Sequence, residues 1–334
     1  LDSCKEFDIY NNIEDGKKSI AYKLTFKDTN KTLVEEEVMQ VFKSNIANLK
    51  KLDNEGVEIV CFNELSLTGY SAKDLFFTSD LLSNTLKGLE RLKKESEKLN
   101  LIFVVGAPIK INSRLYNCAI TIGGGEYLGV SVKKYLTSDE RRYFESGNDL
   151  EDTYITLNNE SVLVSGNILY KSSEYEYLRF VVNVGNDYLY TNVNEATLVL
   201  NLTSNIALVN NQDYYKDTLV TFTKANNASY VYTSAGVSET SSDVIYSNQI
   251  VITDLDEVIN DANLSFESKY VYQDVDLKRL DSKKLKGVKI NSEYNEVTVD
   301  TYKKEKAEEL FELAKTNDCV LMEALKTAYA PAQN

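Results

Sequence analysis

The stretch that decides the fold is Val57 to Ser71, with the sequence VEIVCFNELSLTGYS. Its first six residues are mostly apolar and end abruptly at Asn63-Glu64, which is typical of a buried strand. Glu64 therefore stands at the carboxyl end of the expected strand, where open α/β sheets collect ligands and chemistry. Taken alone, a carboxylate in this place more often indicates an exposed strand end than an active site.

The composition excludes several classes of site and partner. The chain has 334 residues, of which 43% are hydrophobic, and a formal net charge of −14 at pH 7. This acidic balance leaves no basic footprint for nucleic acid and repels an anionic membrane. The absence of histidine excludes a Ser-His-Asp triad, a Cys-His dyad and any histidine-ligated metal. We therefore expect no metal, no cofactor, no nucleic-acid partner and no membrane partner.

The four cysteines, Cys4, Cys61, Cys118 and Cys319, are scattered and show neither metal-knuckle nor disulfide spacing. The mean hydropathy of −0.32 and the lack of a long apolar run predict a soluble protein. The first residues carry no basic region or apolar block of a signal peptide. We expect a cytoplasmic location, and the missing initiator Met suggests that the sequence is a fragment.

Hydrophobic spacing predicts alternating strands and helices along most of the chain. We expect a strand at 20–26, amphipathic helices at 32–52 and 74–99, and a buried strand at 101–108 that ends at the proline. A hairpin follows, with strands at 115–122 and 127–132 around three glycines. Strands and helices then alternate to about residue 285. This pattern predicts a layered α/β sandwich rather than a simple doubly wound sheet.

The sequence suggests three parts: an irregular extension at 1–18, an α/β domain at 19–285, and a tail at 286–334. The tail is expected to contain a helix and a short strand within 303–331. Locally it resembles a fragment of a glucose–fructose oxidoreductase-type Rossmann domain. That family's Glu-Lys-Pro and its Gly-x-Gly-x-x-Gly are both missing, so we interpret the tail as a packing or oligomerisation element.

The segment Phe62–Ser71, FNELSLTGYS, resembles the first motif of the nitrilase (carbon–nitrogen hydrolase) superfamily. Within that superfamily it is most similar to the glutaminase domains of glutamine-dependent NAD synthetases, which have proline at the position of Asn63. The resemblance implies a four-layer α-β-β-α sandwich over about residues 20–285. It also implies that Glu64 is the general base of a Glu–Lys–Cys triad and that Tyr70 lines the substrate pocket.

The second motif of the family is matched by the hairpin that ends in GVSVKKYL, residues 129–136. In the family, this lysine stabilises the developing oxyanion and the thiolate. The resemblance assigns that role to Lys133, which also lies near the family's usual distance from Glu64. Lys134 is the alternative. Without the family, a Lys-Lys pair would indicate only a solvated strand end.

The third motif departs from the family pattern. The strand FVVNV, residues 180–184, runs into Gly185-Asn186-Asp187, where the family has a catalytic cysteine flanked by acids. Gly185 takes the place of the nucleophile, Asn183 and Asn186 take the places of two acids, and Asp187 is retained. Glycine suits a tight elbow because it reaches positive φ without strain. A single change could be engineered, but the loss of both acids favours natural decay or repurposing.

The substrate pocket also departs from the family. The family's substrate-binding arginine falls at about Asn210, and its serine falls near Thr203 or Asn205. We name Tyr70, Asn186 and Asn205 as candidate substrate-binding residues. The scaffold is thus expected to survive, while the nucleophile and much of the glutamine pocket are not.

These observations leave two functions open. The first is a catalytically inactive nitrilase-fold protein that acts as a binding or assembly module, forms a homo-oligomer and has room for a small amide. The second is an active hydrolase, a glutamine amidase that supplies ammonia for NAD synthesis, with an unusual or engineered nucleophile position. A displaced nucleophile, Ser165, Ser204 or Cys118, would then have to reach Glu64.

Overall fold

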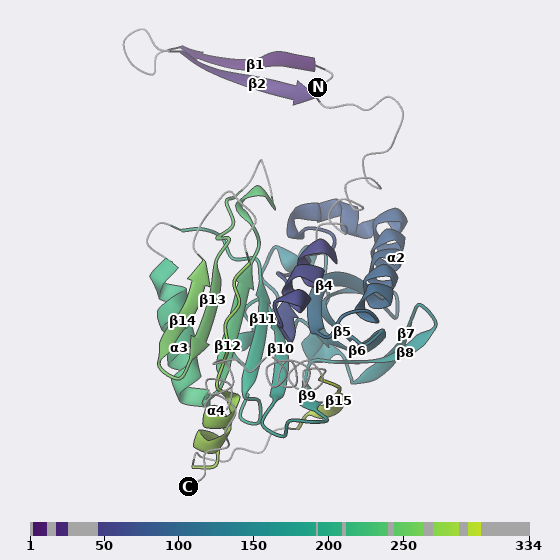
Figure 1. Cartoon of the computed structure of the whole chain (residues 1–334). Coiled ribbons are helices and arrows are strands. Elements are labelled where there is room, and N and C mark those ends of the chain that lie inside the picture. The colour runs from purple at the N-terminus through teal and green to yellow at the C-terminus, as the bar shows by residue number, and fades with distance from the viewer. Residues whose placement is uncertain are drawn as a thin grey trace, which may run out of the picture. The chain divides into compact units, whose positions relative to one another are not determined.

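The computed structural model of the chain describes residues 3–11, 18–25, 46–191, 193–208, 212–239, 244–262, 270–286 and 293–301. The chain divides into two compact units, Leu1–Val41 and Phe42–Asn334. The first unit contains an antiparallel pair, β1 (Ser3–Asn11) and β2 (Lys18–Thr25) (Figure 1). β2 confirms the strand expected at 20–26. Residues 1–18, expected to be irregular, include β1, because its backbone groups are satisfied by pairing with β2.

The second unit contains a six-stranded sheet in which parallel and antiparallel neighbours are mixed. The expected hairpin is confirmed, and its turn has positive φ at Gly124 and Gly125. In spatial order the strands are β3 (Ile59–Cys61), β4 (Ile102–Ile111), β5 (Arg114–Gly123), β6 (Glu126–Val132), β8 (Glu160–Ser165) and β7 (Thr153–Leu157).

A seven-stranded sheet forms the second half of this unit. At its centre β10, β11 and β12 run parallel to one another. Its edge strand β15 lies in the segment 286–334 that the sequence set apart as a tail, whereas the helix expected within 303–331 lies outside the described residues. In spatial order the strands are β14 (Glu257–Ala262), β13 (Ile250–Asp254), β12 (Ser229–Ser234), β11 (Leu198–Thr203), β10 (Arg179–Val184), β9 (Ile168–Ser172) and β15 (Asn295–Val299).

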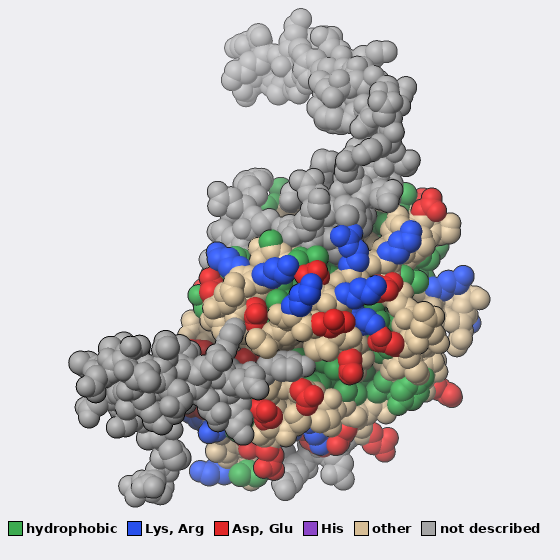
Figure 2. All heavy atoms as spheres, turned by 45° about the vertical axis from the view of Figure 1, so that its right-hand side comes forward, with side chains coloured by type: hydrophobic (Ala, Val, Ile, Leu, Met, Phe, Trp, Pro, Cys, Tyr) green, Lys and Arg blue, Asp and Glu red, His purple; other side chains and the backbone are tan. Residues whose placement is uncertain are grey.

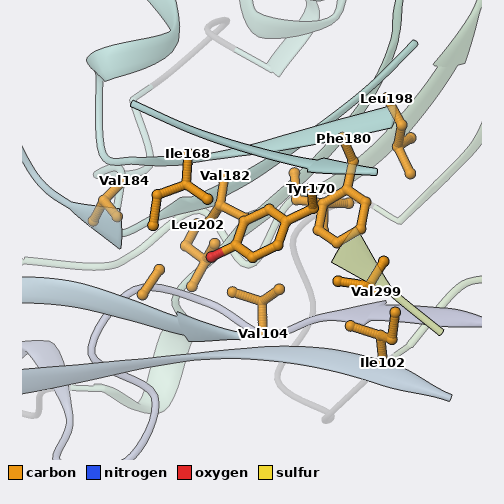
Figure 3. Packing of buried hydrophobic residues seen from close by; sticks show 12 residues of the cluster. Ile102, Val104, Ile168, Tyr170, Phe180, Val182, Val184, Leu198, Leu202 and Val299 are labelled. Atoms are coloured by element: carbon orange, nitrogen blue, oxygen red, sulfur yellow. The ribbon is translucent and has the colours of Figure 1, made fainter. Parts of the chain in front are cut away.

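The two sheets pack face to face through one hydrophobic core. Ile102, Val104 and Ala119 from the first sheet meet side chains of β9, β10 and β11 from the second (Figure 3). Tyr170 and Phe180 stack in this core with ring centroids 4.7 Å apart. Large apolar side chains that are fully buried typically contribute several kcal/mol each, so this layer dominates the stability of the unit.

Helices cover the outer faces of both sheets (Figure 1). α2 (Ser79–Ser96) buries Leu81, Leu89 and Leu92 and packs on β4 and β5. α3 (Gln212–Asn226) packs on β12, β13 and β14, with Leu219 in a core on the outer side of that sheet. The order helix, sheet, sheet, helix confirms the predicted four-layer sandwich.

The remaining helical segments are short. Residues 46–54 are helical, and they are the described part of the helix expected at 32–52. The other short helical segments are α4 (Leu277–Lys284) and the 3-10 helices η1 (Tyr70–Phe77), η2 (Glu140–Arg142), η3 (Gly147–Asp149), η4 (Asp187–Leu189) and η5 (Val237–Glu239).

Basic and acidic side chains are interspersed over the face of the molecule shown in Figure 2.

Gly106 in β4 allows the chain after β3 to lie directly on the sheet. Its N–H donates to Ser66 Oγ at 3.1 Å, and its carbonyl accepts the N–H of Leu67 at 3.1 Å. A Cβ at this position would lie 2.2 Å from the backbone nitrogen of Leu65 and 2.9 Å from the carbonyl carbon of Glu64. A residue without a side chain is therefore required here for Glu64 to occupy its observed position.

We predict that Gly106→Ala lowers the free energy of unfolding by about 3 kcal/mol, the upper end for overpacking, because the colliding atoms belong to the backbone. Gly123→Ala in β5 is the matched control, since a Cβ there meets side-chain carbons of Ile102 and Leu128 at 3.1 Å and 3.4 Å. Urea unfolding of both variants measures the difference. Equal stability of the two variants would contradict the prediction.

Candidate functional site

The ends of three strands from two sheets bring the predicted triad positions together. Glu64 follows β3, Lys133 follows β6 and Gly185 follows β10. The ammonium Nζ of Lys133 lies 2.7 Å from Glu64 Oε1. Glu64 and Lys133 are 1% and 3% exposed, so this ion pair is removed from water. The charged residues of the first and second motifs therefore meet in the fold.

Glu140 is a second carboxylate at the same ammonium, and the sequence analysis did not identify it. Its Oε1 lies 2.5 Å from Lys133 Nζ and accepts the Tyr70 hydroxyl at 2.9 Å. Its Oε2 accepts the N–H of Thr137 at 2.8 Å, while Thr137 Oγ1 accepts the N–H of Glu140 at 3.3 Å. This reciprocal pattern is a capping box. The Thr-x-x-Glu spacing could have located the capping pair, but not the lysine that the carboxylate faces.

Asn117 supports the same group from β5. Its Nδ2 donates to Glu64 Oε1 at 2.7 Å, and its carbonyl accepts the N–H of Lys133 at 2.9 Å. Asn117 is fully buried. It therefore fixes both the carboxylate of Glu64 and the backbone of Lys133 with one residue. The sequence analysis placed Asn117 in the second motif without assigning it a role.

The charges of the cluster do not balance when both carboxylates are ionised, because one ammonium is shared between them. Burial raises the pKa of Glu64 to about 7, and the charge of Glu140 adds to the rise, although Lys133 and Asn117 oppose it. Burial also disfavours the charged form of Glu140, but Lys133 and the hydrogen bonds outweigh it and hold its pKa below the ordinary value. Burial and the neighbouring charge of Glu140 therefore favour the protonated form of Glu64.

Lys133 remains charged in this environment. Burial works against its positive charge, but Glu64 and Glu140 outweigh burial and raise the pKa of the ammonium above its ordinary value. An ammonium held in this way can stabilise negative charge that develops close to it. Glu64 and Lys133 thus place a carboxylate and an ammonium 2.7 Å apart.

Gly185 lies where the side chain of Lys133 passes over the elbow. Its φ is +63°, and a Cβ there would lie 2.2 Å from Lys133 Nζ and 2.4 Å from Cε. The ammonium of Lys133 therefore occupies the space that the first atom of a nucleophilic side chain would take. The turn itself is fixed by hydrogen bonds from the N–H of Gly185 to Leu202 O at 2.7 Å and from Asn201 Nδ2 to Gly185 O at 3.2 Å.

The three candidate pocket residues lie at different distances from this cluster. Tyr70 joins it through Glu140, and its ring meets that of Tyr246 edge-on at 5.7 Å. Asn186 is half-buried in the turn beside Gly185. Asn205 follows β11, and its side-chain amide hydrogen-bonds the hydroxyl of Tyr232.

Lys134 and Asn183 are two further positions in the family motifs. The first has another partner, and the second points in another direction. The ammonium of Lys134, the alternative to Lys133, hydrogen-bonds Asn167 Oδ1. Asn183 is buried two residues before Gly185 in β10. Because Val182 and Val184 point into the core between the sheets, the alternation of the strand turns Asn183 to the opposite face. Lys133 is therefore the lysine at the ion cluster.

The possible displaced nucleophiles are not paired with Glu64. Cys118 alternates with Asn117 along β5, so its thiol lies on the opposite face of the strand from Glu64, and burial raises its pKa. Ser165 Oγ accepts N–H groups from Asn167 and Asn295. Ser204 is buried just after Thr203, whose carbonyl accepts the N–H of Glu64 at 3.4 Å. Its Oγ makes no hydrogen bond within the described part of the chain.

The described residues offer neither a metal-binding cluster nor a membrane-spanning helix. Among the residues that the structure describes, no group of three or more histidine, cysteine, aspartate or glutamate side chains could hold a metal ion. No helix in the described ranges is both long enough and apolar enough to span a membrane.

We predict that Glu64 makes the protein less stable as the pH rises from about 4.5 to 7. Its pKa is about 7 in the fold against an ordinary value of 4.5, so the stability from its protonation is complete below 4.5 and is lost by 7. Buried Asp187, with a pKa raised to about 6 by burial, acts in the same direction. Urea unfolding across this range should show a shallower loss for Glu64→Gln than for the wild type.

The limiting slope for one group is about 1.4 kcal/mol per pH unit. The exposed Glu126 at the start of β6 provides a control, and Glu126→Gln should keep the wild-type slope. The prediction fails if Glu64→Gln and the wild type show the same dependence on pH.

Curated relatives of this chain are glutamine-dependent NAD(+) synthetases. The protein of Mycobacterium tuberculosis H37Rv is 28% identical over 210 residues, which cover 60% of this chain and 31% of that protein. The protein of Aquifex aeolicus is 34% identical over 107 residues, covering 30% of this chain and 19% of that protein. The chain thus matches about a third or less of the length of these relatives.

Solved structures share the fold at low identity. A glutamine-dependent NAD(+) synthetase from Cytophaga hutchinsonii superposes with a TM-score of 0.60 at 24% identity, covering 68% of this chain and 38% of that one. An amidase from Nesterenkonia sp. superposes with a TM-score of 0.54 at 12% identity, covering 68% and 81% of the two chains. At these identities the likeness establishes the fold alone.

Two family models match the chain. The model of the ferredoxin-fold anticodon binding domain matches residues 1–55, a short segment that includes β1 and β2. The model of carbon-nitrogen hydrolases matches residues 29–284, well over half of the chain, and contains the positions of Glu64, Lys133 and Gly185. The chain therefore belongs to the carbon–nitrogen hydrolase family.

Proposed function

We propose that this protein does not hydrolyse amides and instead acts as a binding or assembly module built on the carbon–nitrogen hydrolase fold. The observation that carries the proposal is the pair Gly185 and Lys133. Gly185 supplies no attacking atom at the elbow, and the Lys133 ammonium lies where the first atom of a side chain would be. The base and the cation of the predicted triad are in place, while the third member is not.

The chemistry of the family motif explains why this loss matters. Covalent catalysis splits amide hydrolysis into two easier steps and needs a nucleophile within hydrogen-bond reach of its base. Here Oε1 of Glu64 accepts hydrogen bonds from Lys133 and Asn117. The described thiol on β5, Cys118, lies on the far face of its strand. A base and a cation without a nucleophile favour binding over turnover.

An assembly role is supported by apolar side chains exposed close to the site. Tyr135 follows Lys133, and Tyr190 follows the elbow; their rings lie 4.6 Å apart and are 38% and 64% exposed. Leu189 beside them is 36% exposed. Aromatic residues on a surface contribute strongly to protein interfaces. We therefore propose a homo-oligomer, with a small amide as the ligand compatible with Glu64 and Tyr70.

We predict that the purified protein releases no ammonia above background from glutamine or from simple amides such as acetamide. The reason is the missing nucleophile. Coupled ammonia detection measures the rate, with the Nesterenkonia amidase as a positive control in the same assay. Light scattering after size exclusion tests the assembly role separately. Turnover that survives repurification and disappears in Glu64→Gln would overturn the proposal.

Gly185→Cys should not restore hydrolysis and should destabilise the fold. A Cβ at this position collides with Lys133, so the ammonium must leave its place between Glu64 and Glu140. Positive φ at a residue other than glycine costs about 1–2 kcal/mol in addition. Gly185→Ala is the matched control, because it brings the same backbone cost without a thiol.

The two variants should lose similar stability in urea unfolding, and both should remain inactive toward glutamine. Glutaminase activity in Gly185→Cys that is absent from Gly185→Ala would show that the pocket still recognises its ancestral substrate. It would support the alternative function, a working glutamine amidase altered only at the nucleophile.

A further inference from the structure

Asp187 forms a link between the elbow and the strand that carries Lys133. It begins η4, two residues after Gly185, and is 2% exposed. Its Oδ2 accepts the N–H of Lys134 at 2.8 Å, and its Oδ1 accepts the N–H of Tyr135 at 2.9 Å. Because β10 and β6 belong to different sheets, this carboxylate fastens one sheet to the other beside the ion cluster.

The backbone around Lys133 is also held from its own side of the molecule. Its N–H donates to Asn117 O, and its carbonyl accepts the N–H of Gly147 at 2.8 Å. Ser146 Oγ donates to the carbonyl of Lys134 at 2.6 Å. These contacts come from β5 and from the start of η3, so they fix Lys133 relative to the first sheet. The hydrogen bonds to Asp187 fix it relative to Gly185 in the second sheet.

Burying the carboxylate of Asp187 beside the elbow lowers the stability of the fold, which indicates that the carboxylate has a role there. Burial raises the pKa of Asp187 to about 6, and its two hydrogen bonds come from neutral backbone N–H groups. The side-chain ammonium of Lys134, whose backbone N–H donates to Asp187, hydrogen-bonds Asn167 and not the Asp187 carboxylate. The elbow has asparagine at positions 183 and 186, where the family has acids, yet it keeps this one.

We propose that Asp187 is a positioning residue that holds the Lys133 ammonium over Gly185 and between Glu64 and Glu140. It acts through the backbone of Lys134 and Tyr135, while the charges that meet in the cluster belong to Glu64, Lys133 and Glu140. The two carboxylate oxygens of Asp187 accept these N–H groups and thereby fix the backbone where Lys133 leaves β6. They therefore determine how far the Lys133 side chain reaches. This role is independent of whether the protein hydrolyses amides, because it concerns the placement of the cation alone.

The test is the titration midpoint of Glu64 in the full chain, followed by carbon NMR of 13C-labelled glutamate, with Glu64→Gln used to assign the signal. In Asp187→Asn, one acceptor is replaced by an amide donor that faces an N–H group. The lysine should then drift from Glu64, and the midpoint should rise by about 0.5 pH unit or more, because a nearby cation lowers the midpoint of a carboxyl. Asp187→Glu, which keeps the charge but shifts it by one methylene, should raise the midpoint less.

The matched control is Asp254→Asn in β13. Asp254 is also a buried carboxylate, but it pairs with Arg279 at 2.7 Å in a different part of the fold. Its loss should lower stability and leave the Glu64 midpoint unchanged. A fall in stability for Asp187→Asn and Asp187→Glu with no shift of the midpoint would overturn the proposal. If Asp187→Asn does not fold, the midpoint in Asp187→Glu decides the question alone.

Discussion

One lysine ammonium shared by two buried carboxylates is the interaction on which the site depends. Lys133 reaches both Glu64 and Glu140 within hydrogen-bond distance, and all three are nearly removed from water. Removing Lys133 would leave two buried carboxylates without their cation, and breaking a buried ion pair in this way typically costs about 3–5 kcal/mol. The geometry of this cluster therefore constrains the residues around it. These include Gly106 in β4, which packs against the backbone of Glu64, and the capping box that orients Glu140.

The same constraint ties Gly185 to Lys133. The lysine side chain can cross the elbow because residue 185 has no Cβ, and the elbow tolerates its positive φ because the residue is glycine. The missing side chain at residue 185 and the occupation of that space by the Lys133 ammonium are thus one structural fact. The hydrogen bonds from the N–H groups of Lys134 and Tyr135 to Asp187 connect the elbow to the chain that follows β6 in the other sheet.

Membership of the carbon–nitrogen hydrolase family settles the scaffold but not the reaction, because function resides in particular side chains placed on a fold. The relatives named as glutamine-dependent NAD(+) synthetases are matched over about a third or less of their length. The layers, the convergence of strand ends and the Glu64–Lys133 pair agree with the family. This chain differs from the family at the elbow, and the proposed role as a binding or assembly module rests on that difference.

The sequence by itself determined the layered α/β architecture, because periodic burial is a property of neighbouring residues, and resemblance to the family motifs drew attention to Glu64 and Lys133. The sequence prediction that this strand ends at Pro108 is wrong, because β4 continues to Ile111. β3 pairs only with Ile102–Val104, so among the described residues Pro108 has no partner strand on the β3 side and needs no N–H there. Only the tertiary structure placed Glu140 and Asn117 at the cluster and Lys133 over Gly185. Although Glu140 is only seven residues from Lys133, its distance from the ammonium depends, like those of Asn117 and Gly185, on how the loops and the two sheets pack against each other.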